Sequence, residues 1–282
     1  MSIFASIAFA VPLMLDVAHA QLASPLSTPS SDAVTPGEIV FADLVTTDVE
    51  RAATFYNAVF AWELRRTDDA GYIELVHSGE LIGAIAAFEA DVEPGSARWL
   101  PSVSVIDVDA TASSVVAMGG TIIEPPAEFP DRGRFAVVSD TEGAVLMLLR
   151  SSSGDPPRSP GGFGWAELWS SNVAKAVQFY ESVFGYRALR SANADAPPTV
   201  VLTTGGSARA TIVSSPGDNV DPNWVPYVEV DDAQRTLEEI RRHGGAVLAT
   251  SDDVDDDVGS FAAIIADPTG GVFAIQVREA NP

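Results

Sequence analysis

The sequence predicts an α+β fold with two tandem domains of the same architecture, and its internal repeats carry this prediction. The segment FADLVTTDVERAATFYNAVF, which begins at Phe41, returns 124 positions later as WAELWSSNVAKAVQFYESVF, which begins at Trp165. Later motifs repeat at offsets of 125 to 127 residues, so short loop insertions separate equivalent elements. Within each copy the order strand, helix, strands occurs twice. Each domain is therefore predicted to be a pair of βαβββ modules.

The first copy begins with a short apolar strand over residues 39–45, and a helix follows it at once. Thr47 and Glu50 have the spacing of a capping box, in which each side chain bonds a free backbone amide of the first turn. Apolar residues then recur at helical spacing and form one face, which we interpret as core. They are Ala52, Phe55, Tyr56, Val59 and Phe60, with Ala176, Phe179, Tyr180, Val183 and Phe184 in the second copy.

The rest of the first copy consists of short apolar or alternating runs and a second helix. The helix ends at Gly119-Gly120, where glycine supplies the left-handed C-cap. The runs predict strands over residues 72–77, 81–88, 102–108, 134–139 and 144–149.

The length fits two such domains. The 282 residues, less a leader, give two units, and each has about the size at which a single hydrophobic core becomes self-sufficient. The first domain is predicted over residues 38–150 and the second over 162–278, with a Ser/Pro/Gly-rich linker at 151–161. No apolar run after the leader is long enough to span a bilayer, so no membrane partner is expected.

The chain is strongly acidic, with 39 acidic residues, 16 basic residues and a net charge of −23. Nucleic acid is not an expected partner, because a polyphosphate needs a concentrated positive patch. We interpret the acidity as a solvated surface. The aspartate run at 252–257 lacks the glycine and distal glutamate of an EF-hand, which favours a charged loop over a calcium site. With no cysteine, disulfides and thiol nucleophiles are excluded.

Residues 1–20 have the pattern of a secretory signal peptide. An apolar stretch precedes Ala18-His19-Ala20, the small-x-small pattern that signal peptidase recognises. The expected location is therefore secreted or periplasmic, and the alternative is a cytoplasmic protein whose start site is misassigned. The Ser/Pro/Thr-rich segment 21–37 is predicted to be a flexible linker.

The motifs of the first copy include T-x-D-V-x-x-A-x-x-FY-x-x-VF and a closing D-x-x-G-x-V-x-x-L strand. They resemble the vicinal oxygen chelate superfamily, which includes glyoxalase I, bleomycin-resistance proteins, fosfomycin-resistance enzymes and extradiol dioxygenases. The resemblance covers nearly all of both predicted domains. The chain is especially similar to tandem glyoxalase-like proteins of actinobacterial type, which read W-x-[DE]-L near each domain start. The resemblance implies that each pair of modules forms a curved, bowl-shaped mixed sheet with helices outside. Such motifs specify the fold better than the chemistry.

The resemblance also implies a divalent metal in a bowl, held by His or Glu on the first and last strands of the modules. Counting from the motifs places these positions on Phe41, Leu100 and Met147, and on Trp165, Val225 and Ala274. None of these side chains suits Zn, Fe, Ni or Mn, so no metal and no cofactor is expected. His77 and His243 are interpreted as surface or capping residues.

Strand alternation predicts which residues line the bowls, because residues two apart share a face. The first bowl receives Phe41, Asp43, Ser102, Ser104 and Met147, and the second receives Trp165, Glu167, Trp169, Tyr227, Glu229 and Gln276. The second set mixes flat apolar surfaces with a few polar groups, as small-molecule pockets do. We therefore expect the ligand site in the second domain. The alternative is that these side chains simply fill the bowls.

Glu167 and Glu229 are the candidate catalytic residues. If both face one cavity, burial and mutual repulsion raise the pKa of at least one and create a general acid or base. They could instead share an oxygen-loving cation with Gln276. Arg132 and Arg134 could hold an anionic ligand, or could be exposed arginines on an acidic surface.

Three functions stay open at this point. We prefer a metal-free protein that sequesters or senses a small, largely apolar or aromatic molecule, as bleomycin-resistance relatives do by binding alone. The second is a lyase, isomerase or dioxygenase with a non-standard carboxylate site in the second domain, so enzymatic activity is an open question. The third is a structural module with filled bowls. The partners considered are a small-molecule ligand and a second copy in a homodimer.

Overall fold

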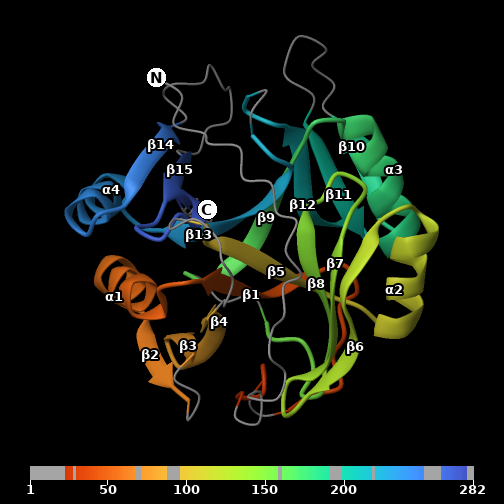
Figure 1. Cartoon of the computed structure of the whole chain (residues 1–282), viewed down its shortest axis with the longest axis horizontal. Helices are drawn as coiled ribbons and strands as arrows, with labels where there is room; N and C mark the ends of the chain where they lie inside the picture. The colour runs from red at the N-terminus through yellow and green to blue at the C-terminus, as the bar shows by residue number, and fades with distance from the viewer. Residues whose placement is uncertain are drawn as a thin grey trace. The chain divides into compact units, whose positions relative to one another are not determined.

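The computed structural model describes residues 23–27, 30–67, 71–87, 96–157, 161–190, 199–217, 220–250 and 262–277 (Figure 1). The predicted signal peptide and the aspartate run at 252–257 lie outside these residues. The first copy contains β1 (Ile39–Thr46), α1 (Val49–Phe60), β2 (Glu63–Arg66), β3 (Tyr72–His77), β4 (Glu80–Ala87), β5 (Arg98–Ser104), α2 (Val108–Ala117), β6 (Thr121–Phe129), β7 (Gly133–Ser139) and β8 (Val145–Ser151). The second contains β9 (Phe163–Ser170), α3 (Val173–Phe184), β10 (Arg187–Arg190), β11 (Val200–Thr204), β12 (Ser207–Ser214), β13 (Asn223–Val230), α4 (Ala233–Arg242), β14 (Ala246–Thr250), β15 (Ala262–Ala266) and β16 (Val272–Val277).

Within the described residues, two eight-stranded mixed sheets and four helices confirm the predicted α+β fold. The strand orders are β2-β3-β4-β1-β5-β8-β7-β6 and β10-β11-β12-β9-β13-β16-β15-β14. The first strand of a module pairs in parallel with its last, as β1 does with β4 and β9 with β12. The other pairs within a module are antiparallel. No described helix is long and apolar enough to cross a membrane.

The chain folds into two compact units, and each unit takes one module from each sequence copy. The first unit contains Met1–Val40, Leu100–Pro156 and Trp165–Val225. The second contains Phe41–Trp99, Pro157–Gly164 and Pro226–Pro282. Each core draws its residues from both copies, and a self-sufficient core within one copy stays a prediction.

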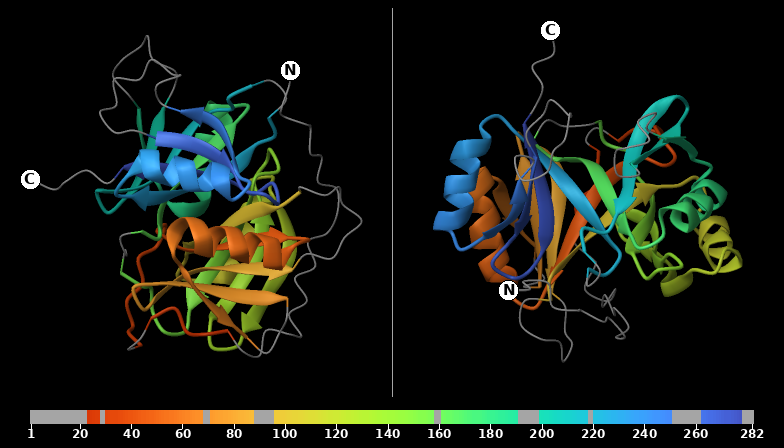
Figure 2. Two further views of the ribbon diagram at one scale, coloured as in Figure 1. Left: turned by 90° about the vertical axis from the view of Figure 1, so that its left-hand side faces the viewer. Right: turned by 90° about the horizontal axis from the view of Figure 1, so that it is seen from above.

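The core of the first unit lies beneath helices α2 and α3, which pack side by side (Figures 1 and 2). Its apolar residues come from the strands of both modules and from the inner faces of both helices. They include Val103, Val115 and Leu146 from the first copy, and Leu168, Phe179 and Ile212 from the second. Burial of these side chains from water is the main favourable contribution to folding of this unit.

The second unit repeats this plan with helices α1 and α4, whose ribbons also lie together (Figures 1 and 2). Phe55 and Tyr56 are at most 1% exposed, and their rings meet edge to face at 5.0 Å. Tyr56 also stacks on Trp62, with 5.7 Å between ring centroids. The predicted core role of the paired aromatic residues is confirmed, because both rings are enclosed by other core side chains.

The cap of helix α1 differs from the prediction. The Asp48 carboxylate accepts a hydrogen bond from the backbone N–H of Arg51 at 3.1 Å, so Asp48 is the N-cap. Glu50 pairs with the guanidinium of Arg66 at 2.8 Å. The predicted capping box of Thr47 and Glu50 is therefore wrong, because an aspartate one residue further along caps the helix and Glu50 has a charged partner.

The predicted glycine stop of helix α2 is confirmed. Gly119 has φ +87°, and the N–H of Gly120 donates to the carbonyl of Val115 at 2.9 Å. In this geometry the next residues satisfy the last free carbonyls of the helix.

Two edge strands were not predicted, and one strand is shifted. β2 has the polar sequence ELRR, and β6 contains a Pro-Pro pair, so neither has the alternating apolar pattern of a strand. Proline is tolerated in β6 because this strand ends its sheet, where a missing N–H donor breaks no ladder. β5 covers Arg98–Ser104 instead of 102–108, because Asp107 already caps the following helix.

The described part of the segment 21–37, predicted as a flexible linker, is held by hydrogen bonds from its backbone N–H groups to side chains elsewhere in the first unit. The N–H of Ser27 donates to Ser153 Oγ at 3.0 Å, and the N–H of Thr35 donates to Asp155 Oδ2 at 2.6 Å. Leu26 is only 3% exposed. Composition indicated a linker because the acceptors lie more than a hundred positions away and leave no local signal.

Candidate functional site

The candidate site begins on β9, where Trp165, Glu167 and Trp169 alternate on one face of the strand. The indole N–H of Trp169 donates to Glu167 Oε1 at 3.0 Å, and that of Trp165 donates to Thr211 Oγ1 at 2.9 Å. Thr211 is the register partner of Glu167 on β12. Trp169 is buried, whereas Trp165 and Glu167 are half-buried. The first unit therefore presents one carboxylate between two indoles.

The second unit contains the other predicted residues of this set, Tyr227, Glu229 and Gln276. Glu229 on β13 and Gln276 on β16 are register partners in a parallel pair, so their side chains share a face. All three side chains are half-buried. Since Glu167 belongs to the first unit and Glu229 to the second, a common cavity for the two carboxylates stays a prediction.

Asp43 lies on β1 in the second unit and belongs to a polar row that the sequence analysis missed. The hydroxyl of Tyr72 donates to Asp43 Oδ1 at 3.3 Å. Glu74 is 0% exposed, and its carboxylate lies 3.7 Å from the guanidinium of Arg65. Arg65, Glu74, Ala84 and Asp43 are successive register partners across four strands. The alternation of Tyr72 and Glu74 within a predicted strand could have placed both on one face.

The remaining residues predicted for the first bowl are closed to solvent. Ser102 and Met147 are register partners on β5 and β8, and the Ser104 hydroxyl donates to Asp155 Oδ2 at 2.7 Å. Every member of the first-bowl set, Phe41 and Asp43 included, is at most 5% exposed. The first-copy residues are therefore buried, whereas most of their second-copy equivalents are half-buried.

Two buried hydrogen-bond networks were not foreseen, and they repeat between the units. In the second unit the Tyr56 hydroxyl donates to Asp267 Oδ2 at 2.8 Å and accepts from the indole of Trp99 at 3.0 Å. In the first unit Tyr180 donates to Asp140 at 3.1 Å and accepts from Trp224 at 3.0 Å. The recurrence of the FY pair, the tryptophan and the D-x-x-G turn at nearly constant offsets could have revealed them.

Each aspartate of these networks also organises a turn between two strands. Asp267 Oδ1 accepts hydrogen bonds from the N–H groups of Thr269 at 2.6 Å and Gly271 at 3.1 Å. Burial raises the pKa of Asp267 above its ordinary value, against the opposing effect of these hydrogen bonds. Burial also raises the pKa of Tyr56 well above its ordinary value, and the charge of Asp267 adds to this effect. Because the tyrosine, aspartate and tryptophan side chains of both networks are buried, we assign these networks a structural role.

The two arginines considered for anion binding are occupied. Arg132 is 2% exposed, and its Nε donates to the carbonyl of Ser24 at 3.1 Å. Arg134 binds Asp109 at 2.6 and 2.8 Å and Glu128 at 3.0 Å. An anion site at these arginines is therefore wrong, because protein carbonyl and carboxylate groups already take their donors.

Both sequence copies match models of known protein families. Residues 162–275 match the model of the Glyoxalase/Bleomycin resistance protein/Dioxygenase superfamily, and residues 38–149 match that of the Glyoxalase-like domain. The chain is 30% identical over 243 residues to "Putative glyoxylase CFP32" of Mycobacterium tuberculosis, with 83% of this chain and 92% of the relative covered. The chain belongs to the glyoxalase/bleomycin resistance/dioxygenase superfamily, as its motifs predicted.

Other relatives carry different names. The chain is 27% identical to "Anthracycline biosynthesis protein DauV" of a Streptomyces species, with 88% of this chain and 96% of the relative covered. Among solved structures, the Mn(II)-bound glyoxalase from Novosphingobium aromaticivorans has a TM-score of 0.61 at 17% identity, covering 86% of this chain and 83% of that one. The 2,3-dioxygenase LapB from Pseudomonas sp. KL28 has 0.60 at 16%, covering 89% and 94%. These structures share the fold.

The divalent metal of the superfamily does not fit its usual positions in this chain. Those positions hold Phe41, Leu100, Met147, Trp165, Val225 and Ala274. Five are buried apolar side chains, and the indole of Trp165 is a donor that already binds Thr211. Because none offers imidazole or carboxylate, we derive no chemical step through a metal at these positions.

Proposed function

We propose that the chain binds a small, largely apolar or aromatic molecule on the face of β9 that carries Trp165 and Glu167, without a divalent metal. The observation that carries this proposal is the difference in burial between the copies. The first-copy residues Phe41 and Asp43 are buried, whereas their counterparts Trp165 and Glu167 are half-buried and retain accessible surface. The half-buried indole of Trp165 lies on the same strand face as the carboxylate of Glu167, which the buried Trp169 orients through its indole N–H. Such a pair suits a flat ligand with one polar group.

The names of relatives support an aromatic ligand. One relative is called an anthracycline biosynthesis protein, and anthracyclines are planar aromatic compounds. Rigid indole faces bind planar rings by offset stacking or edge-to-face contact, which contributes beyond simple burial of area. Sequestration or sensing of such a compound requires no chemical step.

The rival proposal is catalysis, and the half-buried carboxylates of Glu167 and Glu229 favour it. A relative is named as a glyoxylase, so a lyase, isomerase or dioxygenase reaction with a non-standard carboxylate site is the enzymatic alternative. In that case Glu167→Gln removes turnover but leaves binding within a few-fold of wild type. In the binding proposal, no turnover exists to remove.

Binding of a neutral hydroxyanthraquinone, measured by equilibrium dialysis, tests the proposal. Trp165→Ala removes the half-buried indole, and we expect it to weaken binding about fivefold, since loss of a stacking face costs about 1 kcal/mol. Val116→Ala, on an exposed position of α2, is the control. Stoichiometric metal in the purified protein, lost in Glu167→Ala, would contradict metal-free binding.

A further inference from the structure

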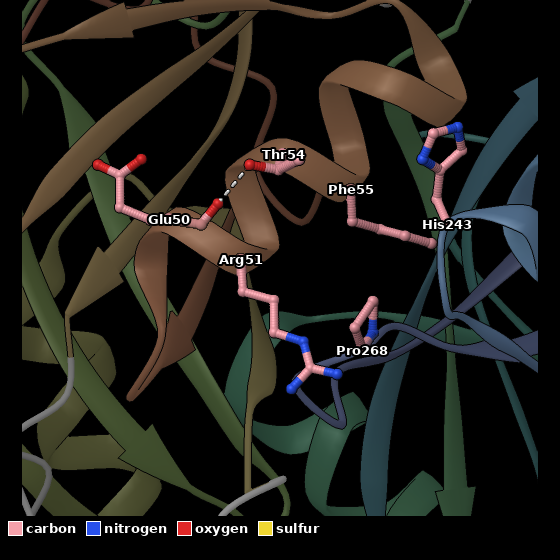
Figure 3. A pocket seen from close by; sticks show the side chains of 6 residues that line it. All are labelled: Glu50, Arg51, Thr54, Phe55, His243 and Pro268. Atoms are coloured by element: carbon pink, nitrogen blue, oxygen red, sulfur yellow. Dashed lines mark hydrogen bonds between the residues drawn. The ribbon is translucent and has the colours of Figure 1, made fainter.

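A cavity of about 340 Å³ lies in the second unit, away from the sheet-face residues. It is formed where the first two turns of α1 meet the C-terminal end of α4 and the turn between β15 and β16 (Figure 3). We call it the α1–α4 cavity. Its lining residues are Glu50, Arg51, Thr54, Phe55, His243 and Pro268. Its volume lies at the lower end of the range for small-molecule sites.

The polar lining of the α1–α4 cavity contains two nitrogen-bearing side chains, Arg51 and His243, beside the hydroxyl of Thr54 and the carboxylate of Glu50. Figure 3 shows the guanidinium of Arg51 extended away from α1, and His243 on the opposite side of the picture from Glu50. The carboxylate of Glu50 already binds Arg66 at 2.8 Å. Among the described residues, Arg51 forms no ion pair through its side chain. The cavity therefore combines a guanidinium and an imidazole with a carboxylate whose charge is already paired.

The apolar part of the cavity is rigid. Phe55 is 1% exposed and is held by edge-to-face contacts with Tyr56 and Phe273. Gly245 lies directly against the Phe55 ring, since a Cβ at this glycine would come within 2.9 Å of it. The buried ring of Phe55 thus closes the base of the cavity, and the partly exposed Pro268 gives its apolar wall.

The equivalent positions in the other unit show which feature is specific to this cavity. Arg51 corresponds to Lys175 and Phe55 to Phe179, but His243 corresponds to Met118. The positive charge and the aromatic wall are therefore common to both copies, whereas the imidazole is present in one.

We propose that the α1–α4 cavity binds a small organic carboxylate with a short apolar body. The guanidinium fork matches the two oxygens of a carboxylate, the imidazole adds a donor, and the wall of Pro268 above the buried Phe55 takes the short apolar part. His243 Nε2 lies 3.5 Å from Glu239, and Glu239 also binds Arg242, so the ligand competes with one existing contact. A multiply charged anion is disfavoured, because the chain carries a net charge of −23.

Titration of the full chain with benzoate, followed by the ring resonances of the histidines, tests this assignment. The chain has three histidines, and His77, which does not line the cavity, is the internal reference. We expect saturable shifts of the His243 resonances while those of His77 stay unchanged. Benzyl alcohol, which has the same ring but no charge, is expected to give no saturable shift.

The affinity of variants for benzoate, measured by calorimetry, separates the contributions of Arg51 and His243 to binding. Arg51→Gln is expected to weaken binding about tenfold or more, because the bidentate pair is lost. His243→Met, which installs the residue of the other copy, should weaken it several-fold, and Lys175→Gln should leave it unchanged. Unaltered thermal unfolding midpoints ensure that a loss of affinity is not a loss of fold.

Several results would overturn the proposal. They are an absence of saturable His243 shifts, equal affinity for inorganic phosphate, or equal losses from Lys175→Gln and Arg51→Gln. The proposed aromatic site on β9 is independent of each of these outcomes, because it contains none of the cavity residues.

Discussion

At the scale of single residues, the buried tyrosine–aspartate pairs explain why the same motifs occur in both copies. Asp267 and Asp140 each hold the turn between two strands and bind the hydroxyl of a helix tyrosine. The tryptophan N–H supplies the remaining donor to that hydroxyl. Every polar atom of the hydroxyl is thus satisfied in an enclosed site, where an unpaired group is costly.

Tyr56→Phe is expected to lower the free energy of unfolding by about 1 to 3 kcal/mol, because Asp267 Oδ2 loses the tyrosine donor and the indole N–H of Trp99 loses its acceptor. Urea unfolding followed by fluorescence measures the change. Tyr180→Phe should have a similar effect in the other unit. Phe60→Leu, on the same helix but without a polar atom, is the comparison. No loss of stability in Tyr56→Phe would contradict the role of the network.

The raised pKa of Asp267 predicts a pH dependence. An acid whose pKa is higher in the folded state binds more protons when folded, so its contribution to stability falls as pH rises from its ordinary value of 3.8 through the raised value. The stability advantage of wild type over Asp267→Asn should therefore shrink across this window. Denaturation at a series of pH values measures it, and an advantage that grows with pH would contradict the sign.

At the scale of elements, the sequence predicted what local patterns specify and missed what distant contacts decide. The helix with Phe55 and Tyr56 was predicted because its apolar spacing is strong. β2 and β6 were missed because their sequences are polar or contain proline, and pairing with a neighbouring strand holds them in place. The alternation along β9 placed Trp165, Glu167 and Trp169 on one face, but it could not show that an indole binds the carboxylate.

The corrected cap of α1 gives a test at this scale. Asp48→Ala is expected to destabilise the second unit by about 1 kcal/mol, because the N–H of Arg51 loses its acceptor. Thr47→Ala, at the position first predicted to cap, should change stability little. Chemical denaturation of both variants measures the two losses of stability. A larger loss in Thr47→Ala than in Asp48→Ala would support Thr47 as the cap.

The amino-terminal segment is expected to contribute to stability through Asp155. Its carboxylate accepts from the N–H of Thr35 and from the hydroxyl of Ser104, so Asp155→Ala should cost about 1 to 3 kcal/mol. Faster proteolysis within residues 23–37 should accompany the loss. Asp32→Ala, an exposed aspartate in the same segment, is the matched control. Equal protease resistance in all three proteins would contradict this role.

At the scale of the whole molecule, the sequence repeats and the compact units divide the chain differently. Each repeat contributes one module to each core, so a single repeat carries two half-cores that its own residues leave uncovered. Self-similarity in sequence revealed the repeats and the fold. It could not reveal this exchange of modules, because the same apolar faces are compatible with either pairing.

Expression of residues 38–150 alone tests the exchange. We expect either an unfolded chain or a dimer in which modules from two copies complete the cores, since exposed half-cores of this size are unfavourable in water. Analytical ultracentrifugation and circular dichroism read out both states. A monomer that unfolds cooperatively would show that one repeat builds a core of its own.

We propose that the two copies keep one fold but differ in function, with a metal-independent ligand face in the second copy. The most direct measurement is the stoichiometry of hydroxyanthraquinone binding to chelator-treated full-length protein, determined by equilibrium dialysis. We predict one site per chain, retained after removal of divalent metal and weakened in Trp165→Ala. Two equal sites, or binding that returns only when a divalent metal is restored, would contradict it.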